Sequence, residues 1–171
     1  TRWISAGDGS AGQRLSGING RNRNTQHCLI SACNDLQAIE AYLYKYRAQP
    51  KTFRAYQKEL ERFLLWCVLR RRMALSDVLF EDCEAYKDFL GGPDSHWIGP
   101  RAPRLSEHWR PFAGIPSPAS QRYAVQAIRS FYTWLVDVRY LSGNPWVTVA
   151  DPRVEQPIHV IQIEKALPEA L

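Results

Sequence analysis

The sequence lacks any run of apolar residues long enough to cross a membrane, and it has no recognisable signal peptide. A membrane-spanning helix needs about 20 predominantly apolar residues, so we expect no membrane contact. Methionine is almost absent as well, because Met73 is the only one and the chain begins at Thr1. This start indicates a fragment or a processed product of a longer protein.

Cysteine is scarce, and its spacing argues against the common uses of this residue. Cys28, Cys33, Cys67 and Cys83 form no C-x-x-C pair, and no second ligand pair accompanies His27 and Cys28 at the spacing of a zinc site. Two of the thiols fall on apolar helical patterns instead. We therefore expect buried thiols in a reducing cytoplasm, without a disulfide framework, a metal or a cofactor.

Aromatic and basic residues, by contrast, are abundant. The 171 residues are 45% hydrophobic and include six Trp, eight Tyr and six Phe. This content is enough to bury one core, and it excludes a chain that is disordered over most of its length. The net charge is +5 and the isoelectric point is about 9.2. Clustered arginines in a basic chain indicate a polyanionic partner, most commonly nucleic acid.

The stretch from Lys51 to Arg72 has the pattern of one long helix with two faces. Apolar residues recur at three- and four-residue steps, the period of a buried stripe: Phe53, Tyr56, Leu60, Phe63, Leu64 and Cys67. The opposite face stacks Arg54, Lys58 and Arg62 at i, i+4 and i+8. Such a basic stripe is either a solvated surface or a contact for a polyanion, and the helix alone does not decide between them.

Two shorter segments also have helical signals. One begins at Asn34, a good N-cap with Gln37 as its capping-box partner, and ends before Pro50. Its expected inward residues are Leu36, Ile39, Leu43 and Tyr46. The other spans about Phe80 to Leu90 and stops at Gly91-Gly92-Pro93. Its expected inward residues are Cys83, Tyr86, Phe89 and Leu90.

The last helix is expected to start at Ser117-Pro118, a hydroxyl cap followed by proline in the first turn, and to run to about Val138. Its core face has Ala124, Ile128, Phe131, Tyr132 and Leu135, and its polar stripe has Arg122, Gln126, Arg129 and Thr133.

Irregular segments separate and flank these helices. Residues 1–24 are rich in Gly and Ser and basic, which predicts a flexible arm that either tracks phosphates or has no partner. Residues 93–116 contain several prolines, basic Arg101, Arg104 and Arg110, and aromatic side chains that predict a loop packed on the bundle. Residues 147–171 resemble a linker. The prediction is an all-α, four-helix domain over residues 25–146.

Two of the predicted helices begin alike. Gln49-Pro50-Lys51-Thr52-Phe53-Arg54 and Ser117-Pro118-Ala119-Ser120-Gln121-Arg122 place a proline, a hydroxyl and an arginine at the same offsets. A helix N-terminus offers free N–H groups and a positive dipole end, and together with a cation this suits a phosphate. A cap that serves only its own helix explains the proline and the hydroxyl equally well. Gln49 is moreover a poor cap.

These residues resemble a known family. Thr52 to Trp66 follows the pattern T-x-x-x-Y-x-x-x-L-x-x-F-x-x-W and resembles the opening helix of the core-binding domain of tyrosine recombinases, the phage integrase family. Asp82 to Leu90 is similar to the third helix of that domain. Four further segments resemble a bacterial integrase subgroup with an insertion before the last helix: 109–114, 117–122, 131–136 and 140–146.

The resemblance implies a SAM-like bundle that grips duplex DNA with its second and fourth helices, during DNA integration and recombination. It also implies a separate C-terminal catalytic domain with a tyrosine nucleophile, and Glu164 to Leu171 resembles the start of that domain. No histidine is followed three residues later by arginine, so the catalytic H-x-x-R is missing and we expect no catalysis by this fragment. The implied partners are duplex DNA, the catalytic domain and, only on DNA, three further copies in a homo-tetramer.

We therefore predict DNA contacts along these two helices. The predicted contact residues are Lys51, Thr52, Arg54, Lys58, Arg62, Ser117, Ser120, Gln121, Arg122, Gln126 and Arg129. Most would fix the position of the duplex, and only Gln121, Arg122, Gln126 and Arg129 are suited to read base edges. The alternative is a protein–protein interaction module, in which Leu65, Trp66 and Leu69 form an exposed docking patch unless they belong to a wide buried face.

Overall fold

The computed structural model describes residues 9–153, and the regular elements in this range are helices. The α-helices are α1 (Gly9–Leu15), α2 (Asp35–Tyr44), α3 (Pro50–Leu65), α4 (Phe80–Leu90) and α5 (Pro118–Asp137). β-Pairing among the described residues is limited to isolated bridges between Arg23 and Leu141 and between Ile98 and Phe112. The predicted all-α class is confirmed. The segment that resembles the start of a catalytic domain, Glu164 to Leu171, lies outside the described residues.

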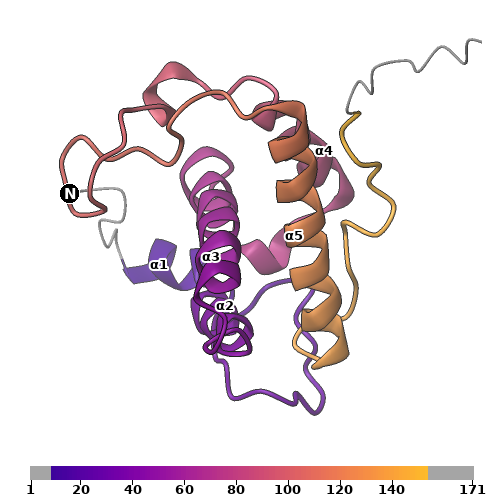
Figure 1. Cartoon of the computed structure of the whole chain (residues 1–171). Coiled ribbons are helices and arrows are strands. Elements are labelled where there is room, and N and C mark those ends of the chain that lie inside the picture. The colour runs from indigo at the N-terminus through magenta and orange to yellow at the C-terminus, as the bar shows by residue number, and fades with distance from the viewer. Residues whose placement is uncertain (1–8, 154–171) are drawn as a thin grey trace, which may run out of the picture.

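The bundle is arranged around α3 and α5. These two helices pack against each other and against α2, and α5 also contacts α4 (Figure 1). The ring of Phe63 on α3 lies at the centre, 4.9 Å from Tyr86 on α4, 6.2 Å from Tyr132 on α5 and 5.5 Å from Trp146. Edge-on aromatic contacts of this kind stabilise a core beyond the area that they bury. No helix in residues 9–153 combines the length and the hydropathy needed to span a membrane.

The start of α2 is as predicted, and of its four expected inward residues Ile39 and Leu43 are buried, Tyr46 packs against the core and only Leu36 is wrong. Asn34 accepts a hydrogen bond from the backbone N–H of Gln37 at 2.9 Å, and the Gln37 side chain accepts one from the N–H of Cys33 at 2.8 Å. The helix ends at Tyr44, and the chain turns before Pro50. Leu36, which was expected inside, is 54% exposed. Asp35 is buried in its place, so the inward period starts one residue earlier and continues through Ala38, Ile39, Tyr42 and Leu43.

The long helix α3 begins at Pro50 without a side-chain cap from Gln49, the weakness that the sequence indicated. It continues through a π-helical turn, η1 (Trp66–Arg70), and the chain leaves it at Arg72, which adopts a left-handed conformation with φ 53°. Leu65 and Trp66 are buried in the core, and Leu69 packs against it. The proposed docking patch of these three residues is therefore wrong, because they belong to a wide buried face.

The later helices agree closely with their sequence signals. α4 has the predicted bounds, and its four expected inward residues are buried, so Cys83, like Cys67 on the core side of η1, is a buried thiol. Asp82 supplies one half of a capping box at the start of α4 by accepting from the N–H of Leu79 at 2.9 Å, and Leu79 has no hydroxyl to supply the other half. Ser117 caps α5 by accepting from the N–H of Ser120 at 3.2 Å, and the predicted core face of α5 is buried.

Residues 9–24 differ from the expected flexible arm. After α1 the chain crosses the bundle, where the Arg23 guanidinium lies 4.1 Å from the centre of the Tyr140 ring. The backbone of Asn22 donates to Ser76 at 3.1 Å and accepts from Ser142 at 2.8 Å. These partners lie far away in the sequence, and so composition alone did not reveal them.

The segment that follows α1 covers a buried polar cluster around Asp35. Asp35 is 1% exposed and accepts hydrogen bonds from the Tyr140 hydroxyl at 2.6 Å, the Ser76 N–H at 2.9 Å and the Ser76 hydroxyl at 3.1 Å. Burial raises the pKa of Asp35, and its hydrogen bonds and the nearby Arg23 oppose that shift. Gly17, with φ 79°, lies against this carboxylate so closely that a Cβ atom would be 2.1 Å from Oδ2. The site therefore needs a glycine there.

The segment between α4 and α5 folds over one end of the bundle (Figure 1). It contains a short 3₁₀ turn, Ser95–Trp97, and buries the side chains of Trp97 and Phe112 against Phe89 on α4, with ring centroids 5.4 and 5.9 Å away. Backbone hydrogen bonds from Gly99 to Phe112 at 2.9 Å and from Phe112 to Trp97 at 3.0 Å close it. The prediction of a packed loop is confirmed.

Candidate nucleic-acid interface

The first half of α3 presents the exposed part of the basic stripe. Lys51, Arg54 and Lys58 are exposed, and Thr52 is half-buried beside them. Among the described residues, Lys51 and Arg54 form no hydrogen bond or ion pair, whereas the Lys58 ammonium lies 3.6 Å from Glu59. Lys51 and Arg54 are therefore free to meet an external anion, whereas Lys58 is exposed but shares its charge with Glu59.

Arg62, the next cation of the stripe, has a different role. Its side chain is only 16% exposed, and Nε donates to the carbonyl oxygen of Pro111 at 2.7 Å. The guanidinium also lies 4.3 Å from the centre of the Phe112 ring and 3.5 Å from the Glu59 carboxylate. Burial raises the pKa of Glu59, and Arg62 and Lys58 oppose the shift. Arg62 thus fastens the loop to α3, and the exposed stripe ends at Lys58.

The N-terminal turn of α5 lies next to this part of α3. The rings of Tyr56 and Tyr123 are stacked with centroids 6.5 Å apart and an interplanar angle of 6°. The Ser117 and Ser120 hydroxyls are exposed and hydrogen-bonded to each other at 3.0 Å. Gln121 is half-buried, and its amide donates to the carbonyl oxygen of Pro116 at 3.0 Å. The stacked rings therefore join the first half of α3 to the start of α5.

Three residues of the polar stripe on α5 contact the chain that follows this helix. Arg129 donates to the Asp151 carboxylate at 2.7 Å and to the carbonyl oxygens of Val149 at 2.6 Å and Trp146 at 3.2 Å. Gln126 donates to Asp151 at 3.1 Å, and the Arg122 guanidinium lies 3.6 Å from the same carboxylate. Figure 1 shows this segment running back along α5. Arg129 therefore holds the protein's own backbone, and Arg122 and Gln126 share an internal anion.

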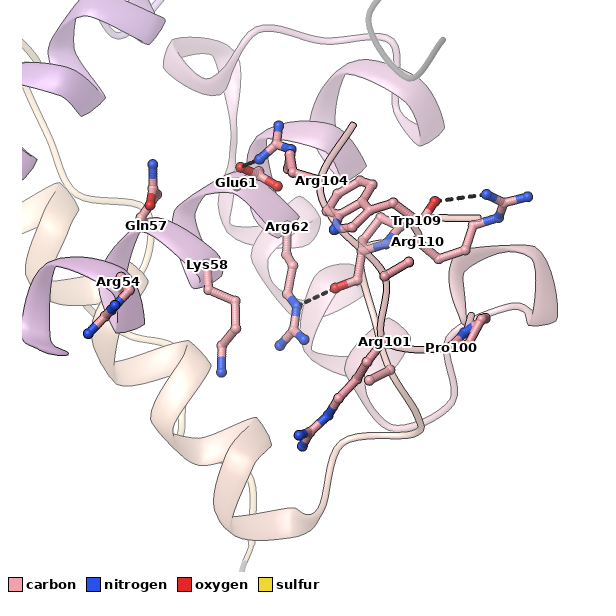
Figure 2. Close-up of a pocket in the computed structure, with 13 residues that line it drawn as sticks. Arg54, Gln57, Lys58, Glu61, Arg62, Pro100, Arg101, Arg104, Trp109 and Arg110 are labelled. Carbon is pink, nitrogen blue, oxygen red and sulfur yellow. Dashed lines mark hydrogen bonds and ion pairs between the residues drawn. The ribbon is translucent and has the colours of Figure 1, made fainter. Parts of the chain in front are cut away.

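Opposite α3, the insertion loop contributes a second row of cations. A groove of about 550 Å³ separates them, lined on one side by Arg54, Lys58 and Arg62 and on the other by Arg101, Arg104 and Arg110. Figure 2 shows Lys58, Arg62 and Arg101 pointing into a common space from the two sides. The groove contains one carboxylate, Glu61, which forms an ion pair with Arg104. The local charge is therefore strongly positive.

The sequence predicted the exposed α3 cations and missed two features of the site. Arg101 was noted only as part of a basic loop, because its place opposite α3 depends on how that loop folds back. Asp151 was not noted at all, and the one available signal was that an acidic residue follows shortly after a basic helix. Groups of three or more His, Cys, Asp or Glu that could hold a metal do not occur in the part of the chain described.

The fold and the surface define an all-α domain with a basic groove between α3 and the insertion loop. Comparison with protein-family models, with curated proteins and with solved structures finds no match to this chain.

Proposed function

We propose that this chain is the DNA-binding, core-binding domain of a site-specific tyrosine recombinase, and that α2 to α5 are its SAM-like bundle. The observation that carries the proposal is the group of exposed cations on α3 and at the start of α5, two helices that pack against each other. There Lys51, Arg54 and Arg122 are exposed on helices joined by the Tyr56–Tyr123 stack. An α-helix fits the major groove of a duplex, and cations along it meet the phosphates on either side.

The contacts divide by chemistry. Lys51, Arg54 and Lys58 would neutralise phosphates, and the hydroxyl of Thr52 would add a hydrogen bond. At α5, Ser120 and Arg122 are exposed and would reach the backbone or a base edge. Arg62 and Arg129 are not proposed as contacts, because both are engaged within the protein. Catalysis would belong to a separate domain of the same protein, and tetramers would form only on DNA.

Binding of duplex DNA is expected to weaken steeply with salt. If about four phosphates are neutralised, a plot of log K against log salt should have a slope of about −4, because each contact releases counterions. Fluorescence anisotropy of a labelled duplex between 50 and 200 mM salt measures this slope. Arg54→Ala should make it shallower by about one unit. A salt-independent affinity would contradict the proposal.

The Asp151 carboxylate is expected to compete with DNA for Arg122 and Gln126. Arg129 holds the pKa of Asp151 below its usual value by hydrogen bonding, so this group is negative at neutral pH. Asp151→Asn keeps the shape and removes the charge, and we expect duplex affinity to rise about three- to tenfold at low salt. The matched control is Asp94→Asn, which removes a carboxylate paired with Arg70 elsewhere. Equal gains in both variants would mean that only net charge matters.

A further inference from the structure

Some of the cations in the groove between α3 and the insertion loop have no partner within the described part of the protein. Arg104 and Glu61 neutralise each other, and Arg62 is committed to Glu59 and to the carbonyl oxygen of Pro111. Arg54 on one wall and Arg101 on the other form no hydrogen bond or ion pair with any described residue, and both are exposed. Two arginines without internal partners therefore flank the same hollow (Figure 2).

The wall that presents Arg101 is well fixed. Phe112 is buried, and its backbone pairs with Trp97 and Gly99 on the other side of the loop. The bond from Arg62 to Pro111 ties the loop to α3, and the Arg104 guanidinium lies 4.8 Å from the centre of the Trp109 ring. At Gly99 a Cβ atom would lie 2.6 Å from the Arg110 side chain, so the loop is closely packed there. A fixed backbone holds a cation in place at a lower entropic cost than a mobile arm does.

We propose that this groove binds the sugar–phosphate backbone of one strand of duplex DNA, so that the insertion loop is a second wall of the DNA grip. The proposal rests on the proposed function and extends it to residues outside α3 and α5. A small-molecule site is disfavoured because such sites are lined mainly by apolar side chains, whereas cations dominate here. Available cations on both sides, Arg54 and Lys58 on α3 and Arg101 on the loop, match a chain of phosphates, in which one negative charge follows another.

The strand would pass between Arg54 and Arg101, and the phosphates at the mouth of the groove would contact both. Lys58 lies on the same side as Arg54 and would contact the next phosphate. The duplex as a whole would remain outside, with one backbone against the groove and the major groove facing α3. Arg101 would position DNA without reading its sequence, because a phosphate contact carries no base information.

The test is a set of single substitutions at Arg101, compared by anisotropy on the same duplex over a range of salt. Arg101→Ala should weaken binding about three- to tenfold at low salt and make the log–log salt slope shallower by about one unit. Arg101→Lys should keep the slope, because the charge remains. The matched control is Arg14→Ala, which removes an exposed arginine on α1 that lines a different hollow. The thermal unfolding midpoint should be unchanged throughout, since Arg101 has no internal partner.

Each outcome decides between the two proposals. If Arg101→Ala binds with the affinity and slope of the parent protein while Arg54→Ala loses both, the groove proposal is wrong and the proposed function stands. If the parent protein binds no duplex at low salt, both proposals are wrong. If Arg14→Ala weakens binding as much as Arg101→Ala, the effect is one of net charge, and the groove proposal is again wrong.

Discussion

Reversing the charges of Arg54 and Lys58 together is expected to abolish retention of duplex DNA without unfolding the domain. Each substitution to Glu removes a phosphate contact and adds a negative charge facing the backbone. We expect affinity to fall about 100-fold or more at low salt. Both side chains are exposed, and the one internal contact at stake is the ion pair of Lys58 with Glu59. Glu59 is buried, and it keeps Arg62 as a second cationic partner, 3.5 Å away, in this variant.

A matched variant separates an effect of this face on DNA binding from an effect of the net charge of the protein. Arg14→Glu combined with Arg72→Glu makes the same charge change at exposed positions around a different hollow. Gel retardation and anisotropy should show strong loss for the first pair and modest loss for the second. Circular dichroism should show folded helices in both. If the Arg54 and Lys58 double variant retains a duplex as well as the parent protein does, the assignment of this face is wrong.

Arg129 is unsuitable for charge reversal because its side chain holds the segment after α5 in place. Its guanidinium bonds Asp151 and the carbonyl oxygens of Trp146 and Val149, so a Glu there would repel Asp151 and release the segment after α5. A loss of binding in that variant would not distinguish a lost phosphate contact from a disturbed fold. Choosing substitutions by exposure and by internal partners keeps the test specific.

Local signals predicted the helices well where local chemistry decides the structure. Ser117 with Pro118, and Asn34 with Gln37, mark helix starts because they satisfy backbone N–H groups within one turn. The glycines at 91 and 92 mark the end of α4 for a comparable local reason. Leu36 was wrongly placed on the inward face of α2, because Asp35 beside it is buried by partners from distant segments. No periodicity of apolar residues predicts a buried carboxylate.

The site was predictable only in part, for a related reason. A basic stripe on α3 follows from spacing, and its exposed half is as expected at Arg54 and Lys58. The role of Arg62 depends on a loop about fifty positions later in the chain, and the role of Arg129 on a segment that follows its helix. Both side chains have the same spacing as their exposed neighbours, so their internal partners are visible only in the folded chain.

Replacing Asp35 by Ala is expected to cause the largest loss of stability. The substitution leaves the Tyr140 hydroxyl and the Ser76 N–H without their acceptor in a buried site, whereas the Ser76 hydroxyl keeps the carbonyl oxygen of Gly17 at 3.3 Å. Unsatisfied buried groups of this kind should cost about 3–5 kcal/mol in the free energy of unfolding. The thermal midpoint should fall by about 6–20 °C. The control is Asp88→Ala at an exposed position on α4, where we expect a change within about 0.5 kcal/mol. Equal effects would refute a structural role for Asp35.

The raised pKa of Asp35 makes its contribution to the free energy of unfolding depend on pH. Burial disfavours the ionised carboxylate in the folded state relative to the unfolded state, where its pKa is near 3.8. The stability due to this shift is therefore fully present below pH 3.8 and is lost as the pH rises through the folded pKa. Asp35→Asn cannot ionise. The free energy of unfolding of the parent protein minus that of this variant should therefore fall over this range.

The comparison with Asp35→Asn isolates one group because the other carboxylates are common to both proteins. Asp151, whose pKa is lowered, contributes in the opposite direction, but it does so in the parent and in the variant alike. The neighbouring Tyr140 has a raised pKa and stays protonated over this range. Urea titrations from about pH 3.5 to 7 measure the difference. A difference that is flat or rises with pH would show that Asp35 is not held in a site that disfavours its charge.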